Sequence, residues 1–373
     1  MLRLAEVVRC FQSALSGLSP QQGKVCHQIL RCRTAALGGF QLQCQECGEE
    51  QVLYHACRNR HCPRCQQQAS EQWQQRELAN VVDASYFHLV FTLPHELNGW
   101  VQLHPRVIYG ALFSSVWDTL NTLGRDPKRL NGQLGMTAVL HTWGQNLSQH
   151  VHLHCLIPGG AIAYDQRWHP AKSTYLFPGR VLSRLFRAKM VSRLRQAANE
   201  QQLSRLTNPG EVDHLLKQLM TKEWVVYTKP CLHKAETVVK YLSRYTRKIA
   251  INESRLLAMD ETHVRFRYQD YQDGQSKVMT LEGPEFLRRF LQHVLPHGFM
   301  RIRHFGWLAN ACRKQQLPLV RQAIAALAVT PAVIDKATDT ASVPGFESIP
   351  CSCCKTGVMR VRYPLRPVQQ DYG

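Results

Sequence analysis

Three histidines alternate with apolar residues in the segment Gln149–Cys155, near the middle of the chain. Successive side chains of a β-strand point to opposite faces of its sheet, so this alternation predicts a strand whose two faces differ in chemistry. His150, His152 and His154 would share one face, and the apolar residues between them would share the other. The apolar face belongs in a core, whereas a row of imidazoles is suited to holding a cation.

Strand geometry limits which of these histidines can bind one ion together. Residues two apart on a strand lie roughly 6–7 Å apart at their Cα atoms, and residues four apart lie about twice as far. The pair is therefore either His150 with His152 or His152 with His154, and the spacing favours neither. Two imidazoles leave positions open for a phosphate oxygen, and imidazole suits Mn²⁺ or Zn²⁺ better than Mg²⁺. A third polar ligand is expected, with three candidates: His88, His95 and Glu236. The alternative is a structural row of surface histidines.

A second unusual segment, Lys240–Lys248, places two tyrosines four residues apart among basic side chains. On a helix predicted at residues 236–248, Tyr241 and Tyr245 would be neighbours on one face. Nearby cations lower the pKa of a tyrosine from its usual value of about 10 and favour its use as a nucleophile. The cations here are Lys240, Arg244, Arg247 and Lys248. The alternative is that both rings pack in a core, because apolar residues surround them.

Together, a metal-binding histidine pair and a tyrosine pair predict the cutting and rejoining of DNA strands. Attack by a tyrosine on a metal-activated phosphate would leave a covalent phosphotyrosine and a hydroxyl on the other DNA end. Because the bond energy is retained, rejoining would need no ATP. Two tyrosines would allow two successive attacks without release of the first strand.

A strong positive charge supports a nucleic-acid partner. In a chain of 373 residues, 46 Lys and Arg against 27 Asp and Glu give a net charge of +19, which favours polyanions. A basic helix is predicted at 180–206, and basic and aromatic residues interleave at 265–268 and 301–305, a pattern suited to single strands. Beyond the tyrosine segment, the arginines expected to contact DNA are Arg58, Arg60, Arg64, Arg301 and Arg303.

The sequence does not predict a membrane protein. No apolar run reaches membrane-spanning length, and the N-terminus lacks the apolar stretch of a signal peptide. Hydrophobic residues make up 44% of the chain, enough for a substantial core. We expect a cytoplasmic protein of bacterial origin.

The cysteines cluster in a way that favours metal binding over disulfides. In a reducing compartment, fourteen cysteines argue against a disulfide framework. Cys44 and Cys47 form one CxxC pair, and Cys62 and Cys65 form another after fourteen intervening residues. Two such pairs offer Zn²⁺ four soft ligands in a tetrahedron, so we expect these four cysteines to form one structural zinc site. Residues between the pairs could replace a ligand: Cys57, His55 and His61.

Further cysteines lie on either side of these pairs. Cys26, His27 and Cys32 precede them and could complete another site, although buried thiols fit equally well. Near the C-terminus, half a zinc site would need ligands from elsewhere in the fold. Its cysteines are Cys351, Cys353 and Cys354.

Strand and helix patterns are mixed without a regular βαβ rhythm, which predicts an α+β fold with a largely antiparallel sheet. Strands are expected at residues 86–92, 136–142, 150–157, 223–227, 264–271, 276–281 and 300–304. Helices are expected within 1–35 and at 66–80, 105–120, 180–206, 236–248, 284–294 and 317–329. We expect three parts: a helical, zinc-binding and DNA-binding module at 1–80, a catalytic domain at 81–329 with a helical insert at about 179–220, and a linker with a cysteine-containing tail at 330–373.

Several segments in this order resemble the two-tyrosine rolling-circle transposases of the insertion-sequence ninety-one family, which are HUH endonucleases. The resemblance covers roughly residues 25 to 315. The segments that carry it are 31–39, 57–65, 87–94, 152–160, 241–247 and 301–306. One position usually occupied by glycine in the tyrosine segment is Ser243 here.

The resemblance implies a zinc-binding N-terminal module and a catalytic sheet domain. It implies that His152 and His154 hold a divalent metal, Mg²⁺ or Mn²⁺, with His150 as an alternative ligand, and that Tyr241 and Tyr245 are the nucleophiles. Such enzymes nick one strand at an element end, form a 5′-phosphotyrosine and move the element through a single-stranded intermediate. The implied partners are single-stranded element ends and a target site, and host replication proteins are further candidates.

Three other functions remain open at this stage. A plasmid rolling-circle replication initiator or a conjugative relaxase would use the same chemistry in a different role. A histidine-triad nucleotide hydrolase shares the alternating histidines, with His152 as its nucleophile and no metal, but leaves the tyrosines, cysteines and charge unexplained. A non-catalytic, zinc-dependent DNA-binding protein is the third alternative.

Overall fold

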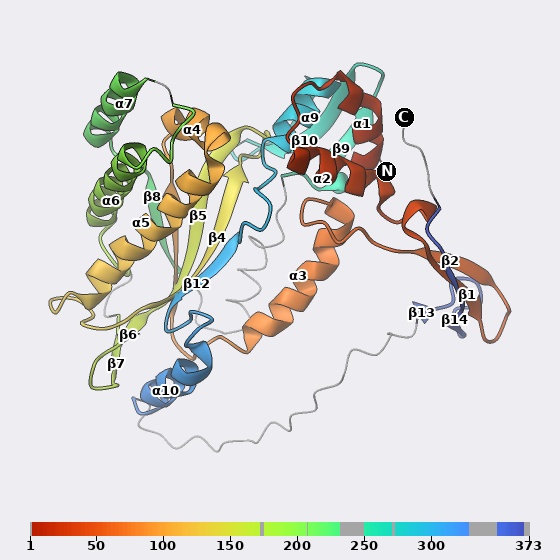
Figure 1. The fold of residues 1–373 in the computed structure, drawn as a ribbon. Helices are drawn as coiled ribbons and strands as arrows, with labels where there is room; N and C mark the ends of the chain where they lie inside the picture. The colour runs from red at the N-terminus through yellow and green to blue at the C-terminus, as the bar shows by residue number, and fades with distance from the viewer. Residues whose placement is uncertain are drawn as a thin grey trace.

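The computed structural model describes residues 2–171, 175–206, 208–231, 250–270, 273–327 and 349–368. Over these residues, helices are mixed with antiparallel sheets, which confirms the α+β prediction (Figure 1). The helices are α1 (Leu4–Phe11), α2 (Pro20–Arg31), α3 (Pro63–Leu78), α4 (Asn98–Leu103), α5 (Pro105–Arg125), α6 (Gly179–Asn199), α7 (Pro209–Thr221), α9 (Gly283–Leu291) and α10 (Arg313–Ala325). The strands are β1 (Gly39–Cys44), β2 (Glu50–Tyr54), β3 (Tyr86–Thr92), β4 (Gly135–Trp143), β5 (Gln149–Pro158), β6 (Gly160–Ile162), β7 (Trp168–Pro170), β8 (Val226–Cys231), β9 (Leu256–Met259), β10 (His263–Gln269), β11 (Ser276–Glu282), β12 (Ile302–Gly306), β13 (Ile349–Pro350) and β14 (Val358–Leu365). Among the described residues, none of the helices combines the length and apolar character needed to cross a bilayer.

The central sheet has five strands in the order β12-β4-β5-β3-β8, and each neighbouring pair is antiparallel. Helices α5 and α6 cover one face of this sheet (Figure 1). Helix α5 begins at Pro105, because proline fits the first turn of a helix, where no hydrogen-bond donor is needed. Its apolar residues recur at helical spacing and pack against the sheet: Ile108, Leu112, Val116 and Leu120.

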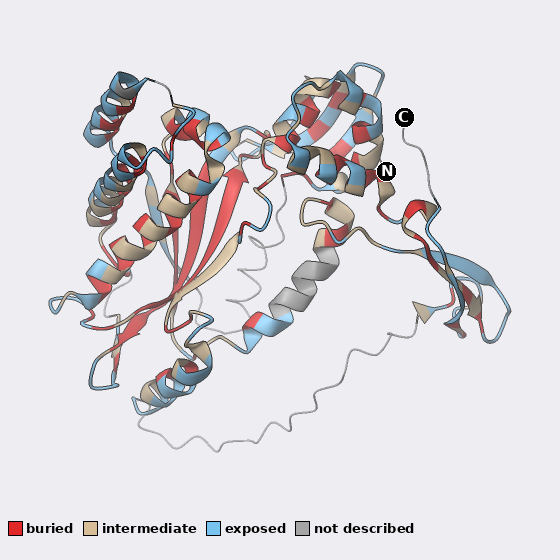
Figure 2. Ribbon diagram, viewed as in Figure 1, coloured by how far each residue is buried: buried red, intermediate tan, exposed pale blue. Residues whose placement is uncertain are grey.

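Strand β5 has the two-faced character that its alternation predicts. Val151, Leu153 and Cys155 lie in the core beneath α5 and α6, together with inward residues of β3 and β4. The histidines of β5 therefore point to the opposite face of the sheet. The three inner strands of this sheet, β3, β4 and β5, are among the most buried parts of the molecule (Figure 2).

A second core joins residues that are far apart in the sequence. Helices α1 and α2 pack against α9 and the hairpin of β10 and β11. The contact between α1 and α9 is close, because a Cβ at Gly283 would lie 2.3 Å from ring atoms of Phe11. The expected division of the chain near residue 80 stays a prediction.

Residues 39–54 and the C-terminal segment of the described chain meet in a four-stranded sheet of order β13-β14-β1-β2. Strand β14 pairs with β1 in antiparallel register, from Gly39 opposite Leu365 to Cys44 opposite Met359. The C-terminal segment, expected as a tail, thus supplies strands to a sheet that begins at residue 39. This sheet lies apart from the central sheet in Figure 1.

Two expected elements have different boundaries in the structure. The helix expected at 180–206 ends at Asn199, and a separate helix, α7, begins at Pro209. The strand expected at 223–227 is β8, which begins at Val226 and includes Pro230. Proline is tolerated there because β8 is an edge strand and needs hydrogen bonds on one side only. The expected tyrosine helix lies outside the described residues.

Candidate metal centre and cysteine clusters

Three histidines converge on the sheet face opposite α5 and α6. His141 of β4 and His152 and His154 of β5 place their ligand nitrogens within 4.8 Å of one another. His141 lies directly opposite His152 in the register between the two strands. All three are buried, with exposed fractions of 2%, 8% and 8%. Because histidine nitrogens bind metals at about 2.1 Å, these three rings can enclose one divalent ion.

Hydrogen bonds orient two of these rings. His152 places Nδ1 2.9 Å from the backbone oxygen of His150, so this nitrogen carries the proton and donates it. His154 places Nδ1 3.0 Å from Nε2 of His88, a neighbour on β3. When Nδ1 is the donor, a neutral imidazole has its lone pair at Nε2. The backbone oxygen of His150 can only accept, so this contact favours the His152 tautomer that binds a metal through Nε2. The ring of His88 favours the same tautomer of His154 when its own Nε2 is the acceptor.

The chemistry of His88 fits the role of acceptor for His154. Burial and the nearby Lys229 ammonium lower the pKa of His88 to about 4. His88 is therefore neutral near pH 7, and its Nε2 can accept the proton that His154 donates. His88, a candidate ligand on sequence grounds, instead contacts the back of a ligand.

The other expected ligands lie elsewhere. His150 is exposed and lies outside the three-histidine cluster, although its ring centroid is 4.9 Å from that of His152. His95 is exposed and pairs with the carboxylate of Glu96 at 3.4 Å. Glu236, the two tyrosines and the cations beside them lie outside the described residues.

Sequence reasoning missed His141 as a ligand. Its strand was expected, and its position alternates with the core residues Ala138 and Leu140, which places it on the histidine face. What the sequence lacked was the register that sets His141 opposite His152, because strand pairing is a long-range property.

The expected DNA-contacting arginines occupy different environments. Arg58 is exposed, whereas Arg60 donates to the backbone oxygens of Phe299 and Pro296. Arg64 donates to the backbone oxygen of Cys32 at 3.4 Å. Burial lowers the pKa of Arg301 to about 10. The guanidinium of Arg303 lies 4.2 Å from the ring centroid of Phe113, on the core side of the sheet.

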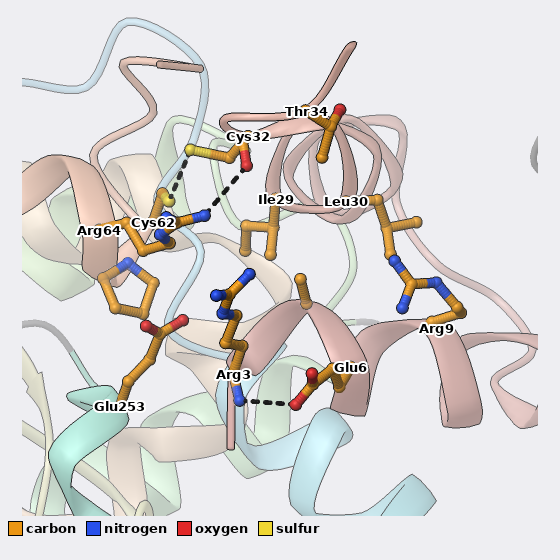
Figure 3. Close-up of a pocket in the computed structure, with 12 residues that line it drawn as sticks. Arg3, Glu6, Arg9, Ile29, Leu30, Cys32, Thr34, Cys62, Arg64 and Glu253 are labelled. Carbon is orange, nitrogen blue, oxygen red and sulfur yellow. Dashed lines mark hydrogen bonds between the residues drawn. The ribbon is translucent and has the colours of Figure 1, made fainter. Parts of the chain in front are cut away.

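The first cysteine cluster consists of Cys32, Cys57, Cys62 and Cys65. Its Sγ atoms are 3.5 Å apart for Cys32 and Cys65, and 3.6 Å apart for Cys57 and Cys65 and for Cys32 and Cys62. Zinc–sulfur bonds of about 2.3 Å in a tetrahedron place sulfurs about 3.8 Å apart, so the spacing fits Zn²⁺. Figure 3 shows Cys32 and Cys62 beside a small cavity of about 80 Å³.

The structure does not bring together the four cysteines of the expected single site, Cys44, Cys47, Cys62 and Cys65. The two CxxC pairs lie in different clusters: Cys62 and Cys65 join Cys32 and Cys57, the alternative ligand. The remaining pair joins two C-terminal cysteines in a second cluster, whose members are Cys44, Cys47, Cys351 and Cys354. The physical reason is that β1 and β2 belong to a sheet separate from the first cluster, and Cys44 and Cys47 lie at one end of their hairpin. In the same sheet, β14 pairs with β1 and places the C-terminal cysteines beside this pair.

Comparisons with known proteins identify families whose matches span these residues. Residues 135–316, which include the three histidines, match the family described as "Putative transposase". Residues 4–93, which include the first cysteine cluster, match the family described as "Transposase zinc-binding domain". The fold, the cysteine cluster and these matches define a zinc-binding transposase.

Relatives narrow this class. The "Putative transposase y4qJ" of Sinorhizobium fredii is 42% identical over 319 residues, which cover 83% of this chain and 80% of the relative. The "Transposase for insertion sequence element IS801" of Pseudomonas savastanoi pv. phaseolicola is 29% identical over 321 residues, or 83% of this chain and 75% of the relative. No solved structure matches the chain. The chain belongs to the insertion-sequence ninety-one family of transposases, which confirms the resemblance seen in its motifs.

Proposed function

We propose that this transposase is a metal-dependent DNA strand transferase of the HUH type. It would nick and join single-stranded ends of an insertion sequence during rolling-circle transposition in the bacterial cytoplasm. The observation that carries the proposal is the convergence of His141, His152 and His154 within 4.8 Å on two paired strands. The transposase matches offer no support for a nucleotide hydrolase and favour transposition over plasmid replication.

The three histidines fit a divalent cofactor. They form a buried set of nitrogen donors, and the hydrogen bond from Nδ1 of His152 to the backbone oxygen of His150 places the lone pair of that ring at Nε2. Three protein ligands leave coordination positions for phosphate oxygens. We propose Mn²⁺ or Mg²⁺ as the cofactor, with His152 and His154 as ligands and His141 as the third. Bound there, the ion would polarise the scissile phosphate.

Tyr241 and Tyr245 are the proposed nucleophiles. A tyrosine oxygen would attack phosphorus and form a new O–P bond, while the bond from phosphorus to the 3′ oxygen breaks. The tyrosine loses its phenolic proton, and the leaving 3′ oxygen takes one up, so the products are a 5′-phosphotyrosine and a 3′-hydroxyl. In the joining step, a 3′-hydroxyl attacks the phosphotyrosine and restores the tyrosine. The second tyrosine would allow a second cleavage before the first strand is released.

Basic side chains would hold the DNA. Lys240, Arg244, Arg247 and Lys248 are proposed to lie near the attacked phosphate, because they share the tyrosine segment. Arg58 is the strongest candidate among the other arginines, because its side chain is exposed. Arg60, Arg64, Arg301 and Arg303 are weaker candidates on the contacts and burial described above. The net charge of +19 predicts that binding weakens steeply as salt rises.

A nicking assay tests the proposal. The purified protein is incubated with single-stranded oligonucleotides that cover both flanks of its own gene, with Mn²⁺, with Mg²⁺ or with a chelator. We expect cleavage and a covalent protein–DNA product only with metal, and loss of both in His141→Ala. Tyr241→Phe with Tyr245→Phe should abolish the covalent product but retain DNA binding. Covalent product in the double tyrosine variant, or full activity with the chelator, would refute the proposal.

A further inference from the structure

We propose that the second cysteine cluster is a structural zinc site of its own, which fastens the C-terminal segment 349–368 into the sheet that begins at residue 39. The zinc-binding family match ends at residue 93 and so does not include Cys351 and Cys354. The inference does not depend on the proposed strand transfer. It rests on the geometry of the four sulfurs, their turns and the size of the surrounding core.

The sulfur positions fit a tetrahedral metal. Cys44 and Cys354 place their Sγ atoms 3.7 Å apart, and Cys47 and Cys351 place theirs 3.6 Å apart. These separations are close to the value of about 3.8 Å for sulfurs around zinc and far from the bond length of about 2.05 Å in a disulfide. In each of these two pairs, one cysteine follows or ends β1 and the other comes from the C-terminal segment.

The two halves of the cluster have matching turns. The amide of Gly48 donates to the backbone oxygen of Cys44 at 3.3 Å, and the amide of Lys355 donates to that of Cys351 at 3.1 Å. Gly48 and Lys355 follow the second cysteine of each pair, and both have positive φ, at 74° and 61°. A left-handed lysine is unfavourable unless its surroundings impose it. A shared metal explains why both pairs adopt the same turn.

Backbone amides face the sulfurs, as they do around thiolate ligands. The amide of Gly357 donates to Sγ of Cys354 at 3.2 Å, and the amide of Cys353 donates to Sγ of Cys351 at 3.4 Å. Such hydrogen bonds stabilise negative sulfur. A Cβ at Gly357 would lie 2.4 Å from Sγ of Cys44, so only glycine lets the backbone approach this closely.

The apolar core around the cluster is small. Its buried members are Leu42, Cys44, Cys351 and Met359, so half of them are cysteines. Small units with so little apolar burial usually need a metal or a disulfide for stability. The metal would therefore supply much of the force that holds β14 against β1.

Counting zinc tests the proposal. Protein purified with a reductant and dialysed against a weak chelator is analysed by native mass spectrometry. We expect Cys351→Ser with Cys354→Ser to hold one zinc ion fewer than the wild type. Cys353→Ser is the matched control, because Cys353 lies between these ligands but outside the cluster, and it should hold as many zinc ions as the wild type. Equal zinc content in the wild type and the double variant would overturn the proposal.

Thiol alkylation of the wild-type protein gives an answer that does not require a folded variant. Cys10, Cys47 and Cys353 are all exposed, but only Cys47 belongs to the cluster. We expect iodoacetamide to label Cys10 and Cys353 at least about tenfold faster than Cys47 and Cys354, because bound metal blocks the thiolates. A chelator strong enough to strip zinc should remove the protection. Labelling of Cys47 as fast as Cys353 before chelation would contradict the site.

Discussion

The orientation of a ligand ring depends on its second nitrogen. At the centre of the sheet, the backbone oxygen of His150 and the ring of His88 each contact Nδ1 of a proposed ligand. The backbone oxygen selects the tautomer of His152, and each contact helps to hold its ring in place. A residue that hydrogen-bonds to a ligand ring can therefore matter as much for metal affinity as a residue that binds the metal directly.

His88→Leu is expected to weaken Mn²⁺ binding by roughly 10- to 100-fold, because the acceptor for His154 is lost. His88→Gln keeps an oxygen that can accept the same proton and should restore part of the affinity. Isothermal titration with Mn²⁺ measures the effect, and exposed His95→Leu serves as a control without change. Equal affinity in His88→Leu and the wild type would show that this contact does not orient the ligand.

A second buried histidine should make stability depend on pH. Burial lowers the pKa of His293 to about 4 in the folded protein, from 6.5. The unfolded chain binds a proton near pH 6.5 and the folded chain only near pH 4, so stability is full above this window and falls as the pH drops through it. Between pH 7.5 and 5.5, this group should cost about 1 kcal/mol. Urea unfolding should show that His293→Gln loses about 1 kcal/mol less than the wild type over this range, and equal losses would contradict the assignment.

Some residues of the metal centre could be predicted from sequence and others could not. The alternation at 149–155 identifies His152 and His154 as neighbours on one face, because a period of two follows directly from strand geometry. His141 depends on which strand lies beside β5 and in which register, and local pattern carries no such information. The choice among Cys44, Cys57 and the other cysteines failed for the same reason, since the fold decides which pairs meet.

At the scale of elements, strand β5 connects the core to the metal centre. Its apolar face packs under α5 and α6, and this packing fixes the height and direction of the histidines on the other face. The helices on one side therefore contribute to the site on the other, although they contact none of its nitrogens. A rigid sheet is a suitable support for a site that needs fixed ligands.

Leu153→Ala should show this coupling. Leu153 lies between His152 and His154 in the sequence, and its side chain is fully buried in the core. Truncation to alanine should therefore lower the free energy of unfolding by about 2–5 kcal/mol. The substitution should also weaken Mn²⁺ binding, because the cavity that it leaves lets β5 and its histidines move. Val278→Ala, at a half-exposed position of the hairpin, is the control with little effect on either quantity. Urea unfolding and Mn²⁺ titration measure both, and unchanged stability in Leu153→Ala would contradict the packing.

Element types were easier to predict than element ends. The strands at 86–92 and 150–157 have long apolar or alternating patterns and lie where expected. The basic pattern at 180–206 suggested one helix, but Asn208 caps a second by accepting from the amide of Gly210 at 3.1 Å. The strand expected at 223–227 lies at Val226–Cys231 as β8 and includes Pro230, which an edge strand tolerates.

At the scale of the whole molecule, three units are built from segments that are distant in sequence. The central sheet takes strands from residues 86 to 306, the second core joins α1 with α9, and the cysteine-bearing sheet joins β1 with β14. The C-terminal segment therefore shares a sheet with residues of the N-terminal segment, through the pairing of β14 with β1. Local sequence patterns could not predict this arrangement, because pairings such as β14 with β1 and β12 with β4 join residues that are far apart in the sequence.

A truncated protein that ends at residue 327 tests whether the cysteine-bearing sheet and the central sheet bind metal independently. It lacks Cys351 and Cys354 and should hold one zinc ion fewer than the full chain. It retains every strand of the central sheet, so Mn²⁺ binding by the histidines should change by less than about twofold. Native mass spectrometry and Mn²⁺ titration test both outcomes. Loss of Mn²⁺ binding with the tail would show that the two units depend on each other.

The central claim is that a tyrosine of this chain attacks DNA phosphorus beside the three-histidine centre. Mass spectrometry of a trapped oligonucleotide–peptide conjugate tests it most directly, with Mn²⁺ and a single-stranded oligonucleotide from the flank of the gene. The account predicts a peptide that carries a 5′-linked nucleotide on Tyr241 or Tyr245, formed in the wild type and absent in His152→Ala. A conjugate on another residue, or cleavage of the oligonucleotide without any conjugate, would contradict it.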